Sequence, residues 1–421
     1  MSETRPLDGT RVLACFGHFW MGGGLEIQSF EVLRALQDAG AAIHVVTNDW
    51  PADDDPPTPH RIKAMVRRLG ASHSTGRYRS WLRKTWNPVE WFQALYDVAV
   101  SSLQLLRDAR RFRPTHLLVP DYLTAVRIFP ALLWSRLRRR KVILRVGNVP
   151  ERKRSHQVLW RRVLPWAVDE FVANSLFGLR RLQETGLPPA RIACVRNAVA
   201  TRANAATLPP ETLEFLRQRP TVVCLGQIAP FKGTHHAIAA TEKLLAEGRD
   251  FQLAIVGRMP NWPAELAAYG AELERAAAGA DPAGRIRFLG EIGDVPGLLA
   301  ETYLMVAPIE QEETFGNVAL EAKVAGVPAV VTPRGGLIEL VDHRRTGWIA
   351  AAADADSVAA GMAHFLDDPA ARAAASAACR AELDDSACPD RRDVFEFGWR
   401  GRFTLPPTAG DVSGLKLESA R

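Results

Sequence analysis

The feature that most constrains the fold of this chain is a pattern of alternating apolar runs and helical segments that occurs twice in succession. In the first round, the apolar run at 11–16 is followed by the glycines at 22–24 and by a segment, 25–40, whose apolar residues recur at three-residue intervals. Another apolar run, 42–49, comes next, and the order strand, glycine loop, helix and strand is typical of a parallel α/β domain. The pattern begins again at residue 221. The order of elements therefore predicts an α/β fold with two Rossmann-like, doubly wound domains that face each other across a central cleft.

Further apolar runs and helical stretches fill both rounds. We expect strands in the first half at 115–121, 141–148, 168–175 and 191–199, and in the second half at 221–228, 251–257, 285–291, 302–308 and 328–333. Residues 60–112, which hold Trp81, Trp86 and Trp91, are predicted to be helical.

Changes in composition indicate where the domains begin and end. Segment 200–220 is small, polar and proline-bearing, and we expect it to be the interdomain linker. This expectation places the N-terminal domain at 1–205 and the C-terminal domain at 206–390. The aromatic face of 393–403 predicts a C-terminal helix, within about 391–421, that packs back on the N-terminal domain.

Composition excludes several classes of protein. The 5 cysteines are scattered, without a CxxC pair or a cysteine–histidine cluster at zinc spacing, which argues against a structural zinc or disulfides and favours a reducing cytoplasm. The N-terminus shows no basic-then-apolar leader, and no apolar stretch reaches the roughly 18 residues of a spanning helix. We therefore expect a cytoplasmic protein.

The positive charge of the chain gathers in two segments. The net charge is +6, and basic residues cluster at 136–141 and 151–162. A solvated helix face explains such clusters, and so does attraction to an acidic acceptor or to an anionic membrane surface, such as the inner membrane face. We expect no nucleic-acid partner. A peripheral membrane contact through the basic N-terminal domain stays open, and the sequence does not indicate an oligomeric state.

The most informative stretch for chemistry is 312–336. Glu313 stands eight positions before Glu321, and residues 314–317 lead from an expected strand into a helix. Backbone N–H groups at a helix start are free, and the helix dipole favours negative charge there, so a diphosphate would be well placed. Glu321, two turns along the helix, would face a ribose, and Glu313 would accept hydrogen bonds from sugar hydroxyls.

The same stretch resembles the E-x7-E signature of the family 4 retaining glycosyltransferases, which have the two-domain GT-B fold. Segments 225–233, 251–257, 285–291 and 325–349 resemble the corresponding family segments in the same order. The similarity is strong over 222–350. It is weaker in the N-terminal half, where the GGGLE, PDYLTA, VANS and NAVA segments still fall at the expected places.

The resemblance implies a donor site in the C-terminal domain and two catalytic residues, Lys232 and Glu313. Lys232 would contact the donor diphosphate, Glu321 the ribose, and Glu313 the transferred sugar. The implied donor-binding residues are Gly226, Gln227, Lys232, Glu313, Thr314, Phe315, Gly316, Asn317, Val318 and Glu321, with Gly23 and Gly24 approaching from the N-terminal domain. Gln227 stands where the family usually has an arginine, so neutralisation of the diphosphate would depend on Lys232 and the helix start. Gly316 would let the ligand approach the backbone.

The N-terminal domain is the acceptor-binding half of this fold. Many relatives have a histidine after the strand that here ends in Gly147 and Asn148. Asn148 would still hydrogen-bond a sugar hydroxyl, and His18 would fill part of the missing role. Asp121, at a strand end facing the expected cleft, is a further acceptor-binding candidate. The acidic triplet Asp53–Asp55 lies in a proline-rich loop rather than after a buried strand, so we expect surface there and no metal.

Together these features predict a retaining, metal-independent hexosyltransferase without a cofactor. It would move a hexose or N-acetylhexosamine from a nucleoside-diphosphate sugar, with UDP as the first choice, to a hydroxyl of a bacterial glycan, a lipid-linked saccharide or glycolipid, or a small natural product. The acceptor would attack on the face that the diphosphate leaves. The alternatives are a nucleotide-sugar epimerase or a phosphorylase of the same fold, and an inactive regulator that binds nucleotide sugars.

Overall fold

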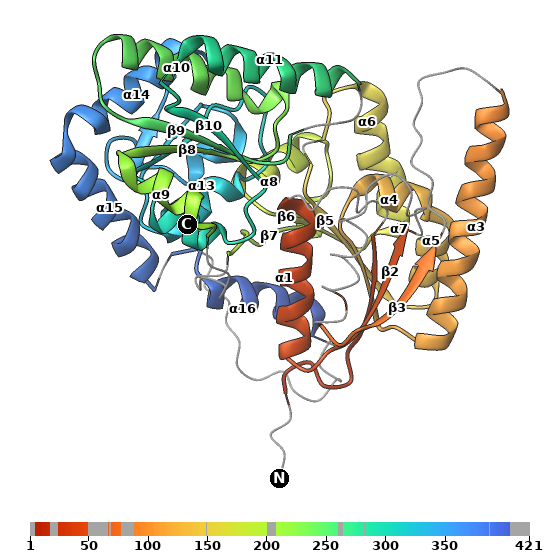
Figure 1. Ribbon diagram of the computed structural model, residues 1–421. Coiled ribbons are helices and arrows are strands. Elements are labelled where there is room, and N and C mark those ends of the chain that lie inside the picture. The colour runs from red at the N-terminus through yellow and green to blue at the C-terminus, as the bar shows by residue number, and fades with distance from the viewer. Residues whose placement is uncertain are drawn as a thin grey trace.

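The computed structural model describes residues 5–16, 24–48, 66, 69–76, 88–148, 150–199, 208–259, 264–281, 283–386 and 388–404. These residues form two parallel sheets, one of seven strands in the order β3-β2-β1-β4-β5-β6-β7 and one of six in the order β10-β9-β8-β11-β12-β13. Helices cover both sheets (Figure 1). The predicted pair of Rossmann-like, doubly wound domains is confirmed.

The N-terminal domain is built on strands buried on both faces. Its strands are β1 (Arg11–Cys15), β2 (Ala42–Asn48), β3 (Ser72–Gly76), β4 (His116–Val119), β5 (Lys141–Val146), β6 (Glu170–Ala173) and β7 (Ile192–Cys194). Its helices are α1 (Gly24–Asp38), α3 (Pro88–Phe112), α4 (Tyr122–Arg127), α5 (Phe129–Leu137), α6 (Arg154–Val158), α7 (Leu164–Ala167) and α8 (Leu176–Glu184), with the π-helical turn η1 (Leu159–Val163) and the 3-10 turn η2 (Pro189–Arg191). All four residues of β4 are buried, as expected for a parallel strand covered by helices on both sides.

The prediction of a helix throughout 60–112 is wrong in part. Strand β3 lies within that range, paired in parallel with β2, and helix α3 begins only at Pro88. The strand has the sequence SHSTG and no apolar periodicity, and side-chain hydrogen bonds help to hold it: the two ring nitrogens of His44 lie 2.7 Å from Ser72 Oγ and 3.1 Å from Ser74 Oγ. A polar edge strand of this kind leaves no hydrophobic signal in the sequence. Trp81 and Trp86 lie outside the described residues.

The C-terminal domain repeats the architecture. Its strands are β8 (Thr221–Leu225), β9 (Gln252–Val256), β10 (Ile286–Gly290), β11 (Leu304–Ala307), β12 (Ala329–Val331) and β13 (Gly347–Ile349). Its helices are α9 (Pro210–Gln218), α10 (Thr234–Ala246), α11 (Ala264–Ala280), α12 (Val295–Ala300), α13 (Asn317–Val324), α14 (Ala355–Asp367) and α15 (Pro369–Asp384), with the 3-10 turns η3 (Pro230–Lys232) and η4 (Gly335–Glu339). The central strands β9 and β11 are buried throughout.

The expected linker, 200–220, contains a helix. Helix α9 occupies Pro210–Gln218 and buries Phe215 and Leu216 in a cluster with residues of the C-terminal sheet. The prolines at 209 and 210 stand at the start of this helix, where the missing N–H of proline costs no hydrogen bond. Their presence therefore marks a helix start rather than a flexible connection.

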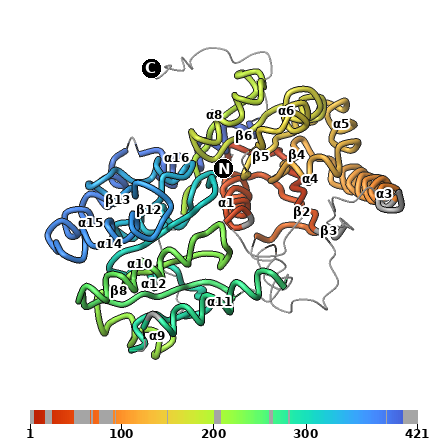
Figure 2. Tube along the Cα trace, turned by 90° about the horizontal axis from the view of Figure 1, so that it is seen from above, coloured from red at the N-terminus to blue at the C-terminus, as the bar shows by residue number. Residues whose placement is uncertain are grey.

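The last described helix, α16 (Arg392–Phe403), returns to the N-terminal domain. It packs beside α1, and its Phe395, Trp399 and Phe403 are buried in the same hydrophobic cluster as residues of α1 and β1. Arg392 forms an ion pair with Glu31 of α1. The two domains lie side by side with α1 at their junction (Figure 2).

Candidate active site

The starts of helices α1 and α13 meet across the junction between the domains. Gly24 is the first residue of α1 and Asn317 the first of α13, and a Cβ placed on Gly24 would lie only 2.4 Å from the Asn317 Nδ2 atom. Each helix start presents free N–H groups and the positive end of a dipole. Two such ends directed at one place are suited to an anion, in particular to phosphate.

Lys232 contacts Glu313, which stands four residues before the start of α13. The Lys232 Nζ atom is 2.6 Å from Glu313 Oε2, and both side chains are about three-quarters buried, with 27% and 23% of their surface exposed. Lys232 ends the turn η3, and the following Gly233 has a positive φ of 72°. A Cβ on Gly233 would lie 1.9 Å from the Pro308 carbonyl oxygen, so only glycine allows the two loops to approach so closely.

The loop from Glu313 to Gly316 is held by a backbone hydrogen bond from another loop and by the burial of one of its side chains. Gly336 donates its N–H to the Glu313 carbonyl at 2.7 Å, and the side chain of Phe315 is buried in the domain core. Only the backbone of Phe315 is therefore available to a ligand. Gly316 caps α13 with a φ of 95°, and a Cβ there would lie 2.4 Å from Leu337 Cδ2. The structure thus gives a conformational and packing reason for glycine at 316, and the expected approach of a ligand to its backbone stays a prediction.

Hydrogen bonds cross from this loop to the N-terminal domain. Thr314 Oγ1 donates to the Gly147 carbonyl at 2.8 Å, and Asn197 Nδ2 donates to Asn317 Oδ1 at 2.9 Å. Asn197 in turn accepts a bond of 2.9 Å from the guanidinium of Arg145, whose side chain is buried within the N-terminal domain. Sequence reasoning did not single out Arg145 or Asn197. The signal that could have found Arg145 is a charged residue inside the otherwise apolar run at 142–146.

A second set of contacts joins the domains at helix α8. Glu339, from the turn η4 of the C-terminal domain, accepts hydrogen bonds from the backbone N–H groups of Leu176 at 3.0 Å and Phe177 at 2.5 Å. Arg196 donates to the Glu339 carbonyl at 3.2 Å and pairs with the buried Asp390 at 2.9 Å. Sequence reasoning also missed Glu339, Arg196 and Asp390. Together these bonds hold the two domains in the arrangement that the structure shows.

Glu321 lies two turns into α13 and is half-buried. Burial raises the pKa of its carboxyl from 4.5 to about 7. Among the described residues, no side chain forms an ion pair or a hydrogen bond with this carboxylate. A half-buried acidic group without a side-chain partner is suited to a ligand that brings hydrogen-bond donors, such as the hydroxyls of a ribose.

The remaining donor-site candidates of the C-terminal domain directly follow β8 or belong to α13. Gly226 directly follows β8 with a φ of 142°, and its carbonyl oxygen would be 1.9 Å from a Cβ on Gly257. Gln227 is exposed, and Val318 is half-buried against the core around α13. Gly23 lies outside the described residues.

The acceptor-site candidates are less closely grouped. Asp121 caps helix α4: its carboxylate accepts hydrogen bonds of 2.7 Å and 2.6 Å from the backbone N–H and the hydroxyl of Thr124. Capping of α4 explains why an acidic residue stands at position 121. The role of Asp121 in binding an acceptor stays a prediction. Asn148 is exposed next to Gly147, which contacts Thr314. His18 and the acidic triplet at 53–55 lie outside the described residues.

A depression of about 500 Å³ opens between the domains next to the donor-site loop. It is lined by Pro150, Glu151, Arg152, Lys153, Arg181 and Glu312. Arg181 is buried and lies 3.7 Å from Glu312, the residue directly before Glu313. A larger depression of about 840 Å³, lined in part by Arg136 and Asp169, lies at the amino ends of β5 and β6. Ligands of such sheets bind at the carboxyl ends, so the smaller depression is the better candidate for an acceptor.

Two family descriptions match the chain, one for each domain. "Glycosyltransferase Family 4" matches residues 22–203, and "Glycosyl transferases group 1" matches residues 219–368. The two matches together cover most of the chain and meet near the break between the two sheets.

Curated proteins with similar sequences are sugar transferases. A lipopolysaccharide core mannosyltransferase, LpcC, of Rhizobium leguminosarum bv. viciae is 31% identical over 38% of this chain and 47% of its own length. A 2-deoxystreptamine glucosyltransferase of Streptomyces kanamyceticus is 32% identical over 40% and 43%. A GDP-mannose-dependent phosphatidylinositol monomannoside mannosyltransferase of Corynebacterium glutamicum is 32% identical over 41% and 44%. The chain thus matches less than half the length of these relatives.

Solved structures with the same fold cover nearly the whole chain. The Anabaena protein HepE in complex with UDP-glucose has a TM-score of 0.73 at 16% identity and covers 93% of this chain and 98% of its own. A sucrose-phosphate synthase of Thermosynechococcus elongatus has a TM-score of 0.71 at 16% identity, with 92% and 96% covered. At this identity the likeness concerns the fold, and it confirms the predicted GT-B architecture.

Proposed function

Because the chain belongs to the family 4 glycosyltransferases, we propose that it moves a hexose or N-acetylhexosamine from a nucleoside-diphosphate sugar to an acceptor hydroxyl with retention of configuration. The C-terminal domain holds the donor and the N-terminal domain holds the acceptor. The observation that carries this proposal is the meeting of the α1 and α13 helix starts, together with the contact of Lys232 with Glu313, four residues before α13.

The donor diphosphate lies between the two helix starts and the Lys232 ammonium. Gln227 donates hydrogen bonds but supplies no charge, so Lys232 and the two dipole ends carry the neutralisation. Glu321, which has no partner among the described side chains, accepts hydrogen bonds from the ribose. UDP is the first nucleotide to test because the solved HepE complexes hold UDP and UDP-glucose, and GDP is the second because a curated relative is named for GDP-mannose.

The reaction needs no nucleophile from the protein. The acceptor oxygen forms a bond to the anomeric carbon on the face that the diphosphate leaves, while the bond from that carbon to the phosphate oxygen breaks. The departing phosphate oxygen takes the proton of the acceptor hydroxyl. Lys232 and the helix starts stabilise the charge that grows on the diphosphate, and Glu313 with the backbone at 315–317 orients the sugar. The cross-domain bonds of Thr314 and Asn317 keep water from the donor.

The acceptor is a glycan, a lipid-linked saccharide or a small molecule, and one exposed surface favours a lipid-linked one. The face of α3 formed by Trp91, Phe92, Leu95, Tyr96 and Leu103 is more than half exposed at each of these residues. Helix α3 stands at the outer edge of the N-terminal domain (Figure 1). None of the described helices is both long and apolar enough to cross a bilayer. Contact through α3 would therefore be peripheral.

A donor panel tests the proposed function. The purified chain is incubated with UDP-, GDP- and dTDP-sugars, with and without added Mg²⁺, and the products are followed by NMR. Slow release of the nucleoside diphosphate from one donor, with a sugar of retained configuration and no requirement for added Mg²⁺, supports the proposal. Formation of an epimer would instead support the epimerase, phosphate-dependent release of a sugar phosphate would support the phosphorylase, and tight binding without turnover would support the regulator.

A further inference from the structure

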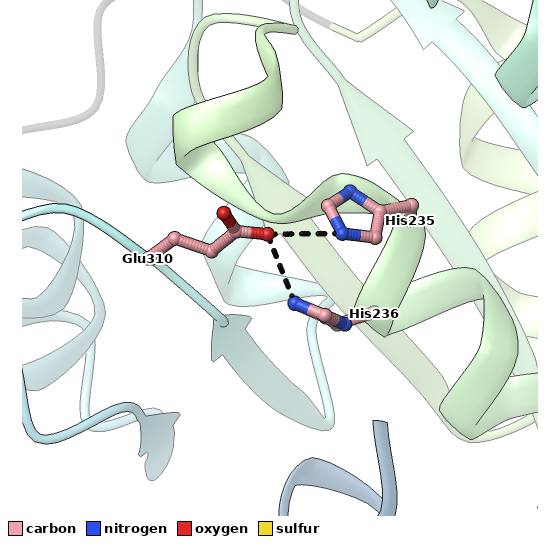
Figure 3. Close-up of side chains that lie close together, drawn as sticks. All are labelled: His235, His236 and Glu310. Atoms are coloured by element: carbon pink, nitrogen blue, oxygen red, sulfur yellow. Dashed lines mark ion pairs between the residues drawn. The ribbon is translucent and has the colours of Figure 1, made fainter. Parts of the chain in front are cut away.

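Two histidine side chains contact the same glutamate in the loop that leads from β11 to Glu313. His235 and His236 are in the first turn of α10, and Glu310 is in the loop after β11. The Nε2 atoms of both imidazoles lie 3.0 Å from the same oxygen, Glu310 Oε1 (Figure 3). One ligand atom from each residue falls within 4.8 Å of the others.

A hydrogen-bond partner on the far side of its ring fixes the orientation of one of the two imidazoles. His235 Nδ1 lies 3.0 Å from the hydroxyl of Tyr269 on α11. When a metal ion displaces the proton from Nε2, the ring proton stays on Nδ1 and is donated to Tyr269, and the Nε2 lone pair is free for the ion. Histidines that bind metals almost always donate their second ring N–H to a fixed acceptor, which sets the tautomer and the ring orientation.

The three candidate ligand atoms determine which metal ions fit this site. Two imidazole nitrogens and one carboxylate oxygen suit zinc and neighbouring transition metals, whereas calcium and magnesium prefer oxygen ligands alone. Ligand atoms on a tetrahedral zinc ion are about 3.4 Å apart, so the two 3.0 Å contacts need to open by only about 0.4 Å. The side chains of His235 and Glu310 are 40% and 38% exposed, which leaves a path for the ion and room for a water ligand.

We propose that His235, His236 and Glu310 bind one divalent transition-metal ion, zinc in the first instance, and that this ion clamps the start of α10 to the loop after β11. These two segments already touch, because Glu310 donates its N–H to the Phe231 carbonyl at 3.0 Å. Phe231 directly precedes Lys232, and Glu310 stands three residues before Glu313. The ion would hold in place the two loops that carry these side chains without itself binding the diphosphate.

Cobalt provides a direct test. Tag-free, full-length protein is stripped with a chelator, dialysed and titrated with Co²⁺ in the absence of any nucleotide. We expect one equivalent of bound Co²⁺ with the strong visible absorption of a four-coordinate site, displaced by one equivalent of Zn²⁺. The variants His235→Gln, His236→Gln and Glu310→Gln should each weaken Co²⁺ binding at least about tenfold.

Matched controls separate this site from incidental binding. His364→Gln, on α14, and Glu312→Gln, in the same loop as Glu310, should leave the Co²⁺ affinity unchanged. Circular dichroism checks the fold of each variant, and three independent ligand variants keep the test decisive if one of them fails to fold. Absence of saturable binding in the unsubstituted chain, or equal binding in all folded ligand variants, would overturn the proposal. Neither result depends on whether the chain is a sugar transferase.

Discussion

The ammonium of Lys232 rests 2.6 Å from the carboxylate of Glu313. The two residues come from different loops, one after β8 and one after β11, and these strands are parallel neighbours in the sheet. Without a donor, each side chain thus neutralises the other. A bound diphosphate and sugar would compete for both groups, the phosphate for Lys232 and the sugar hydroxyls for Glu313.

Loss of either partner is expected to reduce turnover with little effect on folding. Lys232→Ala and Glu313→Ala should each lower kcat/KM for the donor by at least about 100-fold, because each removes a group that faces charge or hydroxyls in the transition state. Lys243→Ala is the matched control, since Lys243 forms an exposed ion pair with Asp356 and contacts neither Lys232 nor Glu313. Steady-state rates and Tm are compared for the three variants. Near-normal rates in both site variants would show that the site is misplaced.

The raised pKa of Glu321 predicts that nucleotide affinity depends on pH. Burial moves this pKa to about 7, above its ordinary 4.5, so the carboxyl is protonated at pH 6 and ionised at pH 8. Ribose hydroxyls donate to the ionised form and favour it. Affinity for UDP or GDP should therefore fall by up to about tenfold between pH 8 and pH 6, because binding must then release a proton.

Calorimetric titrations of the unsubstituted chain and of Glu321→Gln at pH 6, 7 and 8 check this dependence. The glutamine variant should bind more weakly at pH 8 and lose the part of the slope that Glu321 contributes. The phosphates of the nucleotide titrate in both experiments, so the comparison rests on the difference between the slopes. Parallel slopes in the two proteins would remove Glu321 from the nucleotide site.

Patterns of apolar residues were sufficient to predict most of the sheet but not its polar edge. Strands such as β4 and β11 are continuous apolar runs because helices bury both their faces, and this leaves a clear signal. Strand β3 is held by the pairing with β2 and by hydrogen bonds from His44, and neither appears in its own sequence. Helix α9 was mistaken for a linker because its prolines were interpreted without their position in the helix.

For the candidate site, the sequence showed the local motifs but not the contacts between residues that are distant in the sequence. The helix start at Asn317 follows from the residues around it, whereas the contact of Lys232 with Glu313 depends on the pairing of β8 with β11. The same pairing brings His235 and His236 to Glu310, which is distant in the sequence. The bonds of Glu339 to α8 depend on how the two domains pack, and nothing in either segment alone indicates them.

The hydrogen bonds of Glu339 to α8 predict that this residue helps to hold the two domains together. In Glu339→Ala the N–H groups of Leu176 and Phe177 lose their acceptor from the other domain, so the contact between the two domains should weaken. Small-angle X-ray scattering of the ligand-free variant should give a larger radius of gyration than the unsubstituted chain. Glu301→Ala is the control, since Glu301 pairs with Arg217 within the C-terminal domain. An unchanged radius for Glu339→Ala would mean that other contacts set the closure.

The apolar face of α3 predicts peripheral binding to membranes. Phe92 and Leu95 are 73% and 64% exposed one turn apart, so they would enter the interfacial region of a bilayer together. Exposed arginines, Arg107, Arg110 and Arg111, lie several turns further along α3, where they would meet anionic headgroups if the helix lay flat on the membrane. Co-sedimentation with vesicles that contain anionic lipid should fall at least about tenfold in the double variant Phe92→Asp, Leu95→Asp, since each substitution removes apolar contact and adds a repelled charge. Phe397→Asp is the matched control, because Phe397 is 77% exposed but lies on α16. If the unsubstituted chain does not sediment with the vesicles, or if Phe397→Asp has the same effect, the membrane contact through α3 is wrong.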